Sequence, residues 1–129
     1  MPFKRPQPSL GRSGEAAAER YCQSKGYKIL ERNYRLRGGE IDLIASDHGT
    51  LVFVEVKTRH SEKFGQGELA VTRHKQDQMS KIALSYIQTK GLSGDCRFDV
   101  IALLVGHTGD KARLTHYKNA FPLSERYSV

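Results

Sequence analysis

Cysteine, long apolar runs and clustered histidines are all scarce in this sequence of 129 residues. The two cysteines, Cys22 and Cys96, have no second cysteine or histidine at a metal-binding spacing, which argues against a disulfide framework and a zinc site. No apolar run approaches the roughly 20 residues of a membrane span, and the first residues lack the apolar core of a signal peptide. We therefore expect a cytoplasmic protein with no membrane partner.

Basic side chains are in excess, with 21 Lys and Arg against 14 Asp and Glu and a net charge of +7. The hydrophobic fraction of 38% and the charged fraction of 27% are ordinary for a globular protein rather than a disordered one. Positive charge favours a polyanionic partner, nucleic acid before membrane. Composition alone leaves a basic protein without such a partner equally open.

Three segments differ in composition. Residues 1–12 hold three of the four prolines and three basic side chains without an apolar period, which predicts a flexible basic arm. Residues 13–121 are expected to form a single domain, and residues 122–129 a tail.

The pattern of elements predicts an α/β fold. One helix is expected over about 14–25, with Ser13 as N-cap and Gly26 as its stop. A second runs from Thr72 as N-cap to about Lys90, with an apolar stripe at helical spacing. Strands are expected over 27–34, 40–46, 51–58, 97–105 and 112–118. The order α-β-β-β-α-β-β predicts a mixed β-sheet flanked by helices.

The segment 38–57, GGEIDLIASDHGTLVFVEVK, predicts a hairpin with an unusual set of charges. With a turn at His48 and Gly49, Asp42 would pair with Glu55 and Glu40 with Lys57, all on one face. Two carboxylates facing each other between apolar neighbours repel, and burial increases the cost. A cation or a shared proton would relieve it. The alternative is a salt-bridge ladder with Glu40 and Lys57 beside the two acids.

An aspartate, a glutamate and a lysine in this arrangement suit Mg²⁺-assisted hydrolysis of a phosphodiester. Mg²⁺ prefers hard oxygen ligands, which Asp42, Glu55 and the carbonyl of Val56 could supply. Lys57 could position the attacking water or stabilise charge on the phosphate.

The chain resembles the PD-(D/E)XK nuclease superfamily, and within it the YraN family of small bacterial proteins. The resemblance runs from Gly11 to Phe121 and rests on GRSGEAAAERYCQSKGYKIL, NYRLRGGEIDLIA, LVFVEVKTR, VTRHK and RFDVI. It implies a restriction-endonuclease-like sheet with the active site at the split end of the hairpin. Ile41 stands where the superfamily motif usually has proline, a change that removes no ligand.

Carried over by position, the resemblance makes Asp42 the aspartate of the motif, and Glu55 and Lys57 its ExK. Glu15 corresponds to the first-helix glutamate that completes the metal site in archaeal Holliday-junction resolvases. The implied catalytic set is Glu15, Asp42, Glu55 and Lys57, with Mg²⁺ or Mn²⁺ as cofactor. The resemblance to the resolvases also suggests a homodimer.

DNA contacts are expected from basic residues near the same end of the hairpin, namely Arg35, Arg37, Arg59, Lys63, Arg73 and Lys75. Glu40 and Gln78 are expected to support the site. The resulting hypothesis is a metal-dependent endonuclease acting on DNA, with structured or branched DNA favoured. The alternative is a nucleic-acid-binding module that retains the nuclease fold but does not cleave.

Overall fold

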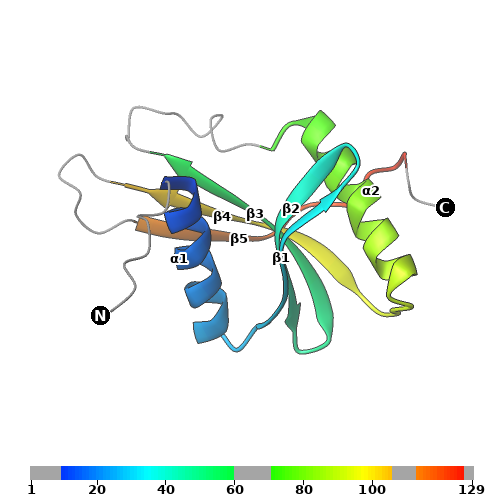
Figure 1. The fold of residues 1–129 in the computed structure, drawn as a ribbon, viewed down its shortest axis with the longest axis horizontal. Helices are drawn as coiled ribbons and strands as arrows, with labels where there is room; N and C mark the ends of the chain where they lie inside the picture. Colours follow the sequence, from blue (N-terminus) through cyan, green and yellow to red (C-terminus); the bar gives the residue numbers. More distant parts are fainter. Residues whose placement is uncertain (1–9, 60–70, 106–112, 127–129) are drawn as a thin grey trace, which may run out of the picture.

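The structure is a computed structural model, and it describes residues 10–59, 71–105 and 113–126. Its elements, in chain order, are α1 (Leu10–Ser24), β1 (Lys28–Leu36), β2 (Gly39–Asp47), β3 (Thr50–Arg59), α2 (Arg73–Thr89), β4 (Cys96–Leu104) and β5 (Arg113–Phe121). This order confirms the predicted α-β-β-β-α-β-β sequence (Figure 1). Neither described helix is long and apolar enough to cross a membrane.

The five strands form one twisted sheet in the spatial order β1-β2-β3-β4-β5. Three neighbouring pairs are antiparallel, and β3 and β4 are parallel, so the predicted mixed sheet is confirmed. The chain between β3 and β4 carries α2, as a parallel crossover requires. The two helices cover different parts of the sheet (Figure 1).

Two hydrophobic clusters hold the helices on the two sheet faces. On the α1 side, Ala18 and Cys22 pack with Val52 and Val54. On the α2 side, Met79, Ile82 and Tyr86 pack with Ile44, Phe53 and Phe98. Alternate residues of a strand point to opposite faces, so β3 sends its valines to one cluster and Phe53 to the other. The β2–β3 hairpin is therefore covered on both faces.

The helix boundaries differ from the prediction at one end only. The first helix begins at Leu10, so Ser13 lies inside α1 instead of capping it, and residues 10–12 belong to α1 instead of the predicted arm. No proline lies between Pro8 and Gly26, so the chain can continue the helix back to Leu10. Gly26 provides that stop with φ +86. Thr72 caps α2 as predicted, since its side chain accepts a hydrogen bond from the Lys75 backbone. Residues 1–9 lie outside the described residues.

A change of face within β2 determines where the candidate site lies. Ile41 belongs to the α2-side cluster, whereas Leu43, two residues later, belongs to the α1-side cluster. In a regular strand these two residues would share a face. On the neighbouring strand β1, Asn33 lies opposite Asp42 and has φ 49, a left-handed backbone conformation that twists β1 at this position. Asp42 therefore lies where the β1–β2 hairpin crosses from one face of the sheet to the other.

Candidate active site

The predicted register of the β2–β3 hairpin is correct near the turn and wrong beyond it. Asp47 pairs with Thr50 and Ile44 with Phe53, as predicted, but the described pairs end at Leu43 and Val54. The predicted cross-strand pairs of Asp42 with Glu55 and of Glu40 with Lys57 therefore fall outside the ladder. The reason is the change of face within β2 at Asp42, which directs the first residues of β2 away from β3.

Beyond Leu43 and Val54 the two strands separate, and at this split the Asp42 side chain makes a hydrogen bond to β3 in place of the strand backbone. Its Oδ2 accepts a hydrogen bond of 2.7 Å from the backbone N–H of Val56. Asp42 is buried, with 9% of its surface exposed. A side chain that pairs with a central strand in this way has a fixed position, so the carboxylate is held beside the next carboxylate on β3.

That second carboxylate belongs to Glu55, and a lysine from α2 lies against it. The Glu55 side chain is 14% exposed, and Lys75 Nζ lies 3.4 Å from Glu55 Oε2. The same ammonium group lies 3.4 Å from the backbone carbonyl of Glu40. Lys75 reaches this point because the Thr72 cap fixes the first turn of α2 above the split. Sequence reasoning placed Lys75 among phosphate contacts, whereas the structure pairs it directly with Glu55.

The electrostatics of the pair are set by burial and by mutual repulsion. Burial raises the pKa of Glu55 to about 7, with further contributions from the charge of Asp42 and from a hydrogen bond between the two carboxyl groups, while Lys75 opposes the rise. One ammonium group thus compensates two carboxylates only in part. The uncompensated charge favours binding of a proton by Glu55 near neutral pH.

The third predicted carboxylate, Glu15, lies on α1. This helix approaches the end of β3 closely, because a Cβ at Gly14 would overlap Thr58 Oγ1. Glu55, in contrast, points to the α2 side, where it meets Lys75. Within residues 10–59, 71–105 and 113–126, no group of three or more His, Cys, Asp or Glu side chains is placed to hold a metal ion. The structure therefore brings together two carboxylates, and a role for Glu15 stays a prediction.

The remaining site residues flank this pair. Lys57 follows Glu55 by two positions on β3, on the same side by strand alternation, and pairs with Ala102 of β4. The carboxylate of Glu40 accepts a hydrogen bond of 2.9 Å from Arg35 Nε. Gln78 Nε2 donates to the carbonyl oxygen of Gly38 at 2.7 Å and so ties the β1–β2 turn to α2.

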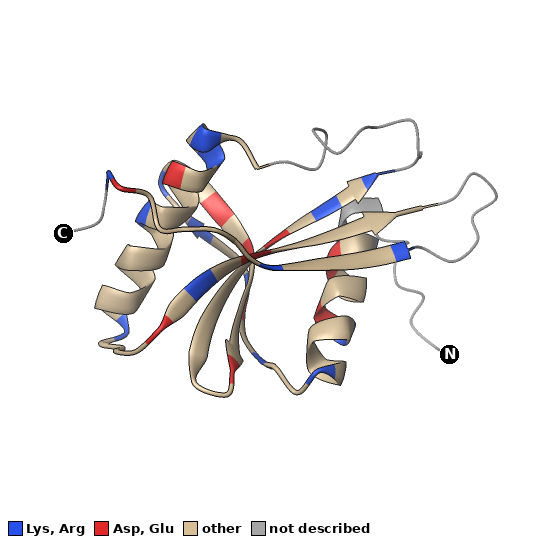
Figure 2. Ribbon diagram, turned by 180° about the vertical axis from the view of Figure 1, so that it is seen from behind, with Lys and Arg blue, Asp and Glu red and all other residues tan. Residues whose placement is uncertain are grey.

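The predicted DNA-binding residues fall in two places. Arg35, Arg37 and Arg73 are exposed around the β1–β2 turn and the start of α2. Arg59 ends β3, where it donates to the Thr58 carbonyl oxygen. Figure 2 shows Lys and Arg, in blue, spread over both helices and the strands. Lys63 lies outside the described residues.

A second polar cluster, centred on Asp99, was not anticipated. Asp99 is fully buried and bonds to Arg97 Nε at 3.0 Å, to the Asn119 N–H at 3.0 Å and to His116 Nε2 at 2.7 Å. Arg97 also reaches Asp47 at 3.0 Å and the Tyr27 hydroxyl at 2.9 Å. Its members are far apart in sequence, and the single available signal was an aspartate within the apolar run RFDVIALLV.

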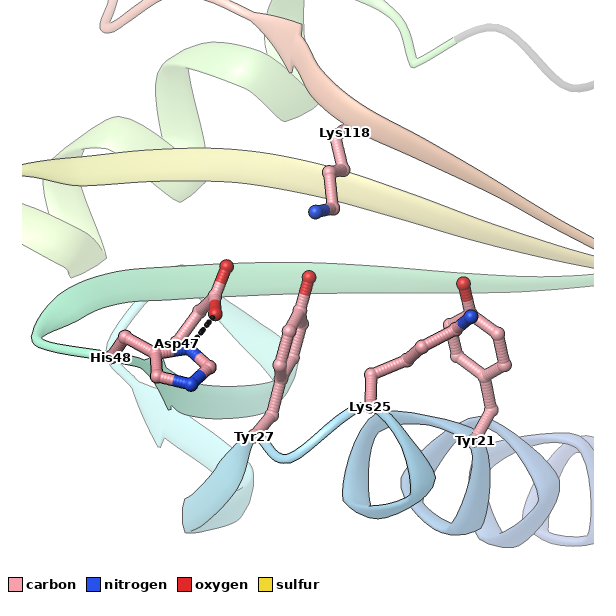
Figure 3. Close-up of a pocket in the computed structure, with 6 residues that line it drawn as sticks. All are labelled: Tyr21, Lys25, Tyr27, Asp47, His48 and Lys118. Carbon is pink, nitrogen blue, oxygen red and sulfur yellow. Dashed lines mark hydrogen bonds and ion pairs between the residues drawn. The ribbon is translucent and has the colours of Figure 1, made fainter.

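A cavity of about 320 Å³ lies beside this cluster. Figure 3 shows its lining, from the end of α1, the β2–β3 turn and β5: Tyr21, Lys25, Tyr27, Asp47, His48 and Lys118. It adjoins the α1-side cluster, and Asp47 is roughly 17 Å along the strand from Asp42 at about 3.4 Å per residue. Among the described residues no buried side-chain nitrogen or oxygen lacks a hydrogen-bond partner. The Asp99 cluster is therefore a satisfied structural network, separate from the carboxylate pair.

Comparison with known proteins identifies the family. The family described as "Uncharacterised protein family UPF0102" matches residues 14–103. A UPF0102 protein of Geobacter metallireducens is 49% identical over 117 residues, covering 90% of this chain and 94% of the relative. A UPF0102 protein of Pelotomaculum thermopropionicum is 47% identical over 113 residues, covering 87% of this chain and 94% of the relative.

A third relative, a UPF0102 protein of Chlorobium chlorochromatii, is 51% identical over 117 residues, with 87% of this chain and 90% of the relative covered. The solved structure described as "Crystal structure of SSO0001" matches at 18% identity and a TM-score of 0.39, covering 91% of this chain and 53% of that chain. The family match and the curated relatives together show that this chain belongs to the UPF0102 (YraN) family, within the restriction-endonuclease-like superfamily.

Proposed function

We propose that this protein is a Mg²⁺- or Mn²⁺-dependent endonuclease that hydrolyses phosphodiester bonds in DNA. The observation that carries the proposal is the pair of buried carboxylates, Asp42 and Glu55, at the split of the β2–β3 hairpin. Such a pair is costly in a folded protein unless a cation or proton compensates it. Lys57, two residues after Glu55, completes the chemistry expected of such a site.

The carboxylate pair fits a divalent cation of the magnesium type. Mg²⁺ sites commonly use one or two carboxylates, with waters and substrate phosphate completing the shell. Asp42 and Glu55 would hold the ion, whose chemistry is to polarise the phosphodiester and to lower the pKa of a bound water. The Val56 N–H keeps Asp42 oriented.

The two lysines would serve different parts of the reaction. Lys57 lies on the Glu55 side of β3 and would orient the attacking water or stabilise the negative charge that develops on the phosphate. Lys75 neutralises part of the Glu55 charge and would turn to the phosphate once a cation supplies that compensation. Branched or structured DNA is the substrate class we favour, and a homodimer would offer two such sites to two strands.

Cleavage assays test this proposal. Labelled single-stranded, duplex, flap and four-way-junction DNA would be incubated with the protein and Mg²⁺, Mn²⁺ or a chelator. Cleavage should require the metal and fall at least about 100-fold in Asp42→Ala and Lys57→Ala. Asp95→Asn, an exposed acid before β4, is the matched control and should cleave normally. Cleavage that persists in chelator or survives both substitutions would reject the mechanism.

The alternative is a module that binds nucleic acid without cutting it. It is favoured by the finding that two acids, and not three, come together within the described part of the chain. Tight, salt-dependent binding of the same DNA panel with no cleavage in either metal would establish it.

A further inference from the structure

A second cavity, of about 200 Å³, lies between α2, the β1–β2 turn and the segment after β5. Three cations from distant parts of the chain line it: Arg37 of the β1–β2 turn, Lys81 of α2, and Arg126 after β5. Asp77 is the single acid among the described lining residues, and the rest of the wall comes from Gly38, His74, Gln78 and Ile82.

Hydrogen bonds fix both outer walls of this cavity to α2. Gln78 Nε2 holds the carbonyl oxygen of Gly38 at 2.7 Å, which places Arg37 next to the helix. The Ser124 N–H donates to Ser80 Oγ at 2.9 Å, and Ser124 Oγ donates to Asp77 Oδ1 at 2.5 Å. The last described residues are thereby anchored, which brings Arg126 to the opposite wall. The three cations converge because the fold is tied together at these points.

The charge inside this cavity is not balanced. Asp77 accepts a hydrogen bond from Ser124 and supplies one negative charge against three positive ones, and within the described ranges no salt bridge reaches Arg37, Lys81 or Arg126. Like charges held together raise the free energy of the folded protein unless a counterion reduces their repulsion. All three residues are exposed, so water screens part of their repulsion, but they line one concave site. An oxyanion is the ligand that such a site favours.

The position of the cavity relative to the carboxylate pair suggests which oxyanion. Lys75, which contacts Glu55, and Lys81 in the cavity are six positions apart on one helix, a rise of roughly 9 Å along its axis at about 1.5 Å per residue. Phosphates follow one another at about 3.4 Å of rise along each strand of duplex DNA. Roughly two to three nucleotides would therefore separate a phosphate in the cavity from one at Asp42 and Glu55.

We propose that Arg37, Lys81 and Arg126 form a pocket for one backbone phosphate of the DNA strand that enters the candidate active site. The identity of the polyanion rests on the proposed function, and the convergence of the cations does not. A phosphate contact of this kind carries no sequence information but sets the register of the strand, so that a defined bond meets the carboxylates.

The test is the salt dependence of DNA binding. Fluorescence anisotropy with a labelled duplex in chelator, at several salt concentrations, gives the slope of log K against log salt, which changes by about 0.9 for each phosphate neutralised in B-DNA. The variants are Arg37→Gln, Lys81→Gln, Arg126→Gln and the triple. Lys90→Gln, an exposed cation at the end of the same helix, is the control. Circular dichroism confirms that each variant is folded.

Because the three side chains hold one phosphate, the triple variant should lose about 0.9 from the slope, and the single losses should not add. A decrease in slope near 2.7 in the triple variant would show three independent phosphate contacts, and an unchanged slope would show none. Either result would overturn the shared pocket. An equal decrease in Lys90→Gln would also overturn it. The binding assay contains no metal, so cleavage is scored separately. If the wild type cleaves DNA but the triple variant has an unchanged slope, the phosphate pocket alone is refuted. If the triple variant has a reduced slope but the wild type does not cleave DNA, the endonuclease activity alone is refuted.

Discussion

The carboxylate pair makes a direct prediction about stability and pH, tested by Glu55→Gln. Folding raises the pKa of Glu55 from 4.5 to about 7, so the folded protein binds more protons than the unfolded chain between these values. The free energy of unfolding must then fall as pH rises through this window. One pKa unit corresponds to about 1.4 kcal/mol, which gives a total penalty on the order of 3 kcal/mol above pH 7. Glutamine remains neutral and avoids that penalty.

In chelator, Glu55→Gln should therefore match the wild type near pH 4.5 and exceed its stability by on the order of 3 kcal/mol at pH 8. Urea unfolding followed by circular dichroism is the suitable assay, because the chain contains no tryptophan. Millimolar Mg²⁺ should stabilise the wild type and leave the variant unchanged. Parallel pH profiles for the two proteins would show instead that the pKa of Glu55 is not raised in the folded protein.

Three further predictions concern the surroundings of the site and the rest of the fold. Lys75→Met should raise the pKa of Glu55 above about 7, because Lys75 now lowers it, and carbon NMR of the Glu55 carboxyl group measures the change. Asp99→Asn should destabilise the fold by roughly 3–5 kcal/mol at neutral pH, because Arg97 loses its buried ionised partner. Since folding lowers the pKa of Asp99, the stability that its carboxylate contributes is present above its ordinary pKa and is lost in the wild type, but not in the variant, as the pH falls. Urea unfolding of both proteins at neutral and acid pH tests both points. Gly14→Ala should cost about 1–3 kcal/mol through its overlap with Thr58 Oγ1, although alanine favours helix elsewhere, and Thr58→Ala in the same chain should recover most of the loss in thermal melts.

Much of the fold follows from local sequence patterns. The apolar stripe of α2, the Thr72 cap and the Gly26 stop are encoded by residues close together in the chain, and the structure has all three. The hairpin register near His48 and Gly49 follows from the turn itself. Such features depend on spacing and backbone preference, which a sequence displays directly.

The features that sequence reasoning did not obtain depend on contacts over long distances in the chain. A regular strand was assumed through Asp42, whereas the change of face there depends on Asn33 and on packing of Ile41 and Leu43 against different helices. The pairing of Lys75 with Glu55 requires the crossover that carries α2 over the hairpin. The Asp99 network likewise joins side chains that only the finished sheet brings together.

The central claim is that Asp42 and Glu55 together hold one divalent cation. Titration of the protein with Mn²⁺, followed by electron paramagnetic resonance of the free ion, measures this directly. One Mn²⁺ per chain should bind to the wild type and to Asp95→Asn, and the affinity should fall at least about tenfold in Asp42→Asn. Absence of bound Mn²⁺ in the wild type, or equal affinity in Asp42→Asn, would contradict the claim.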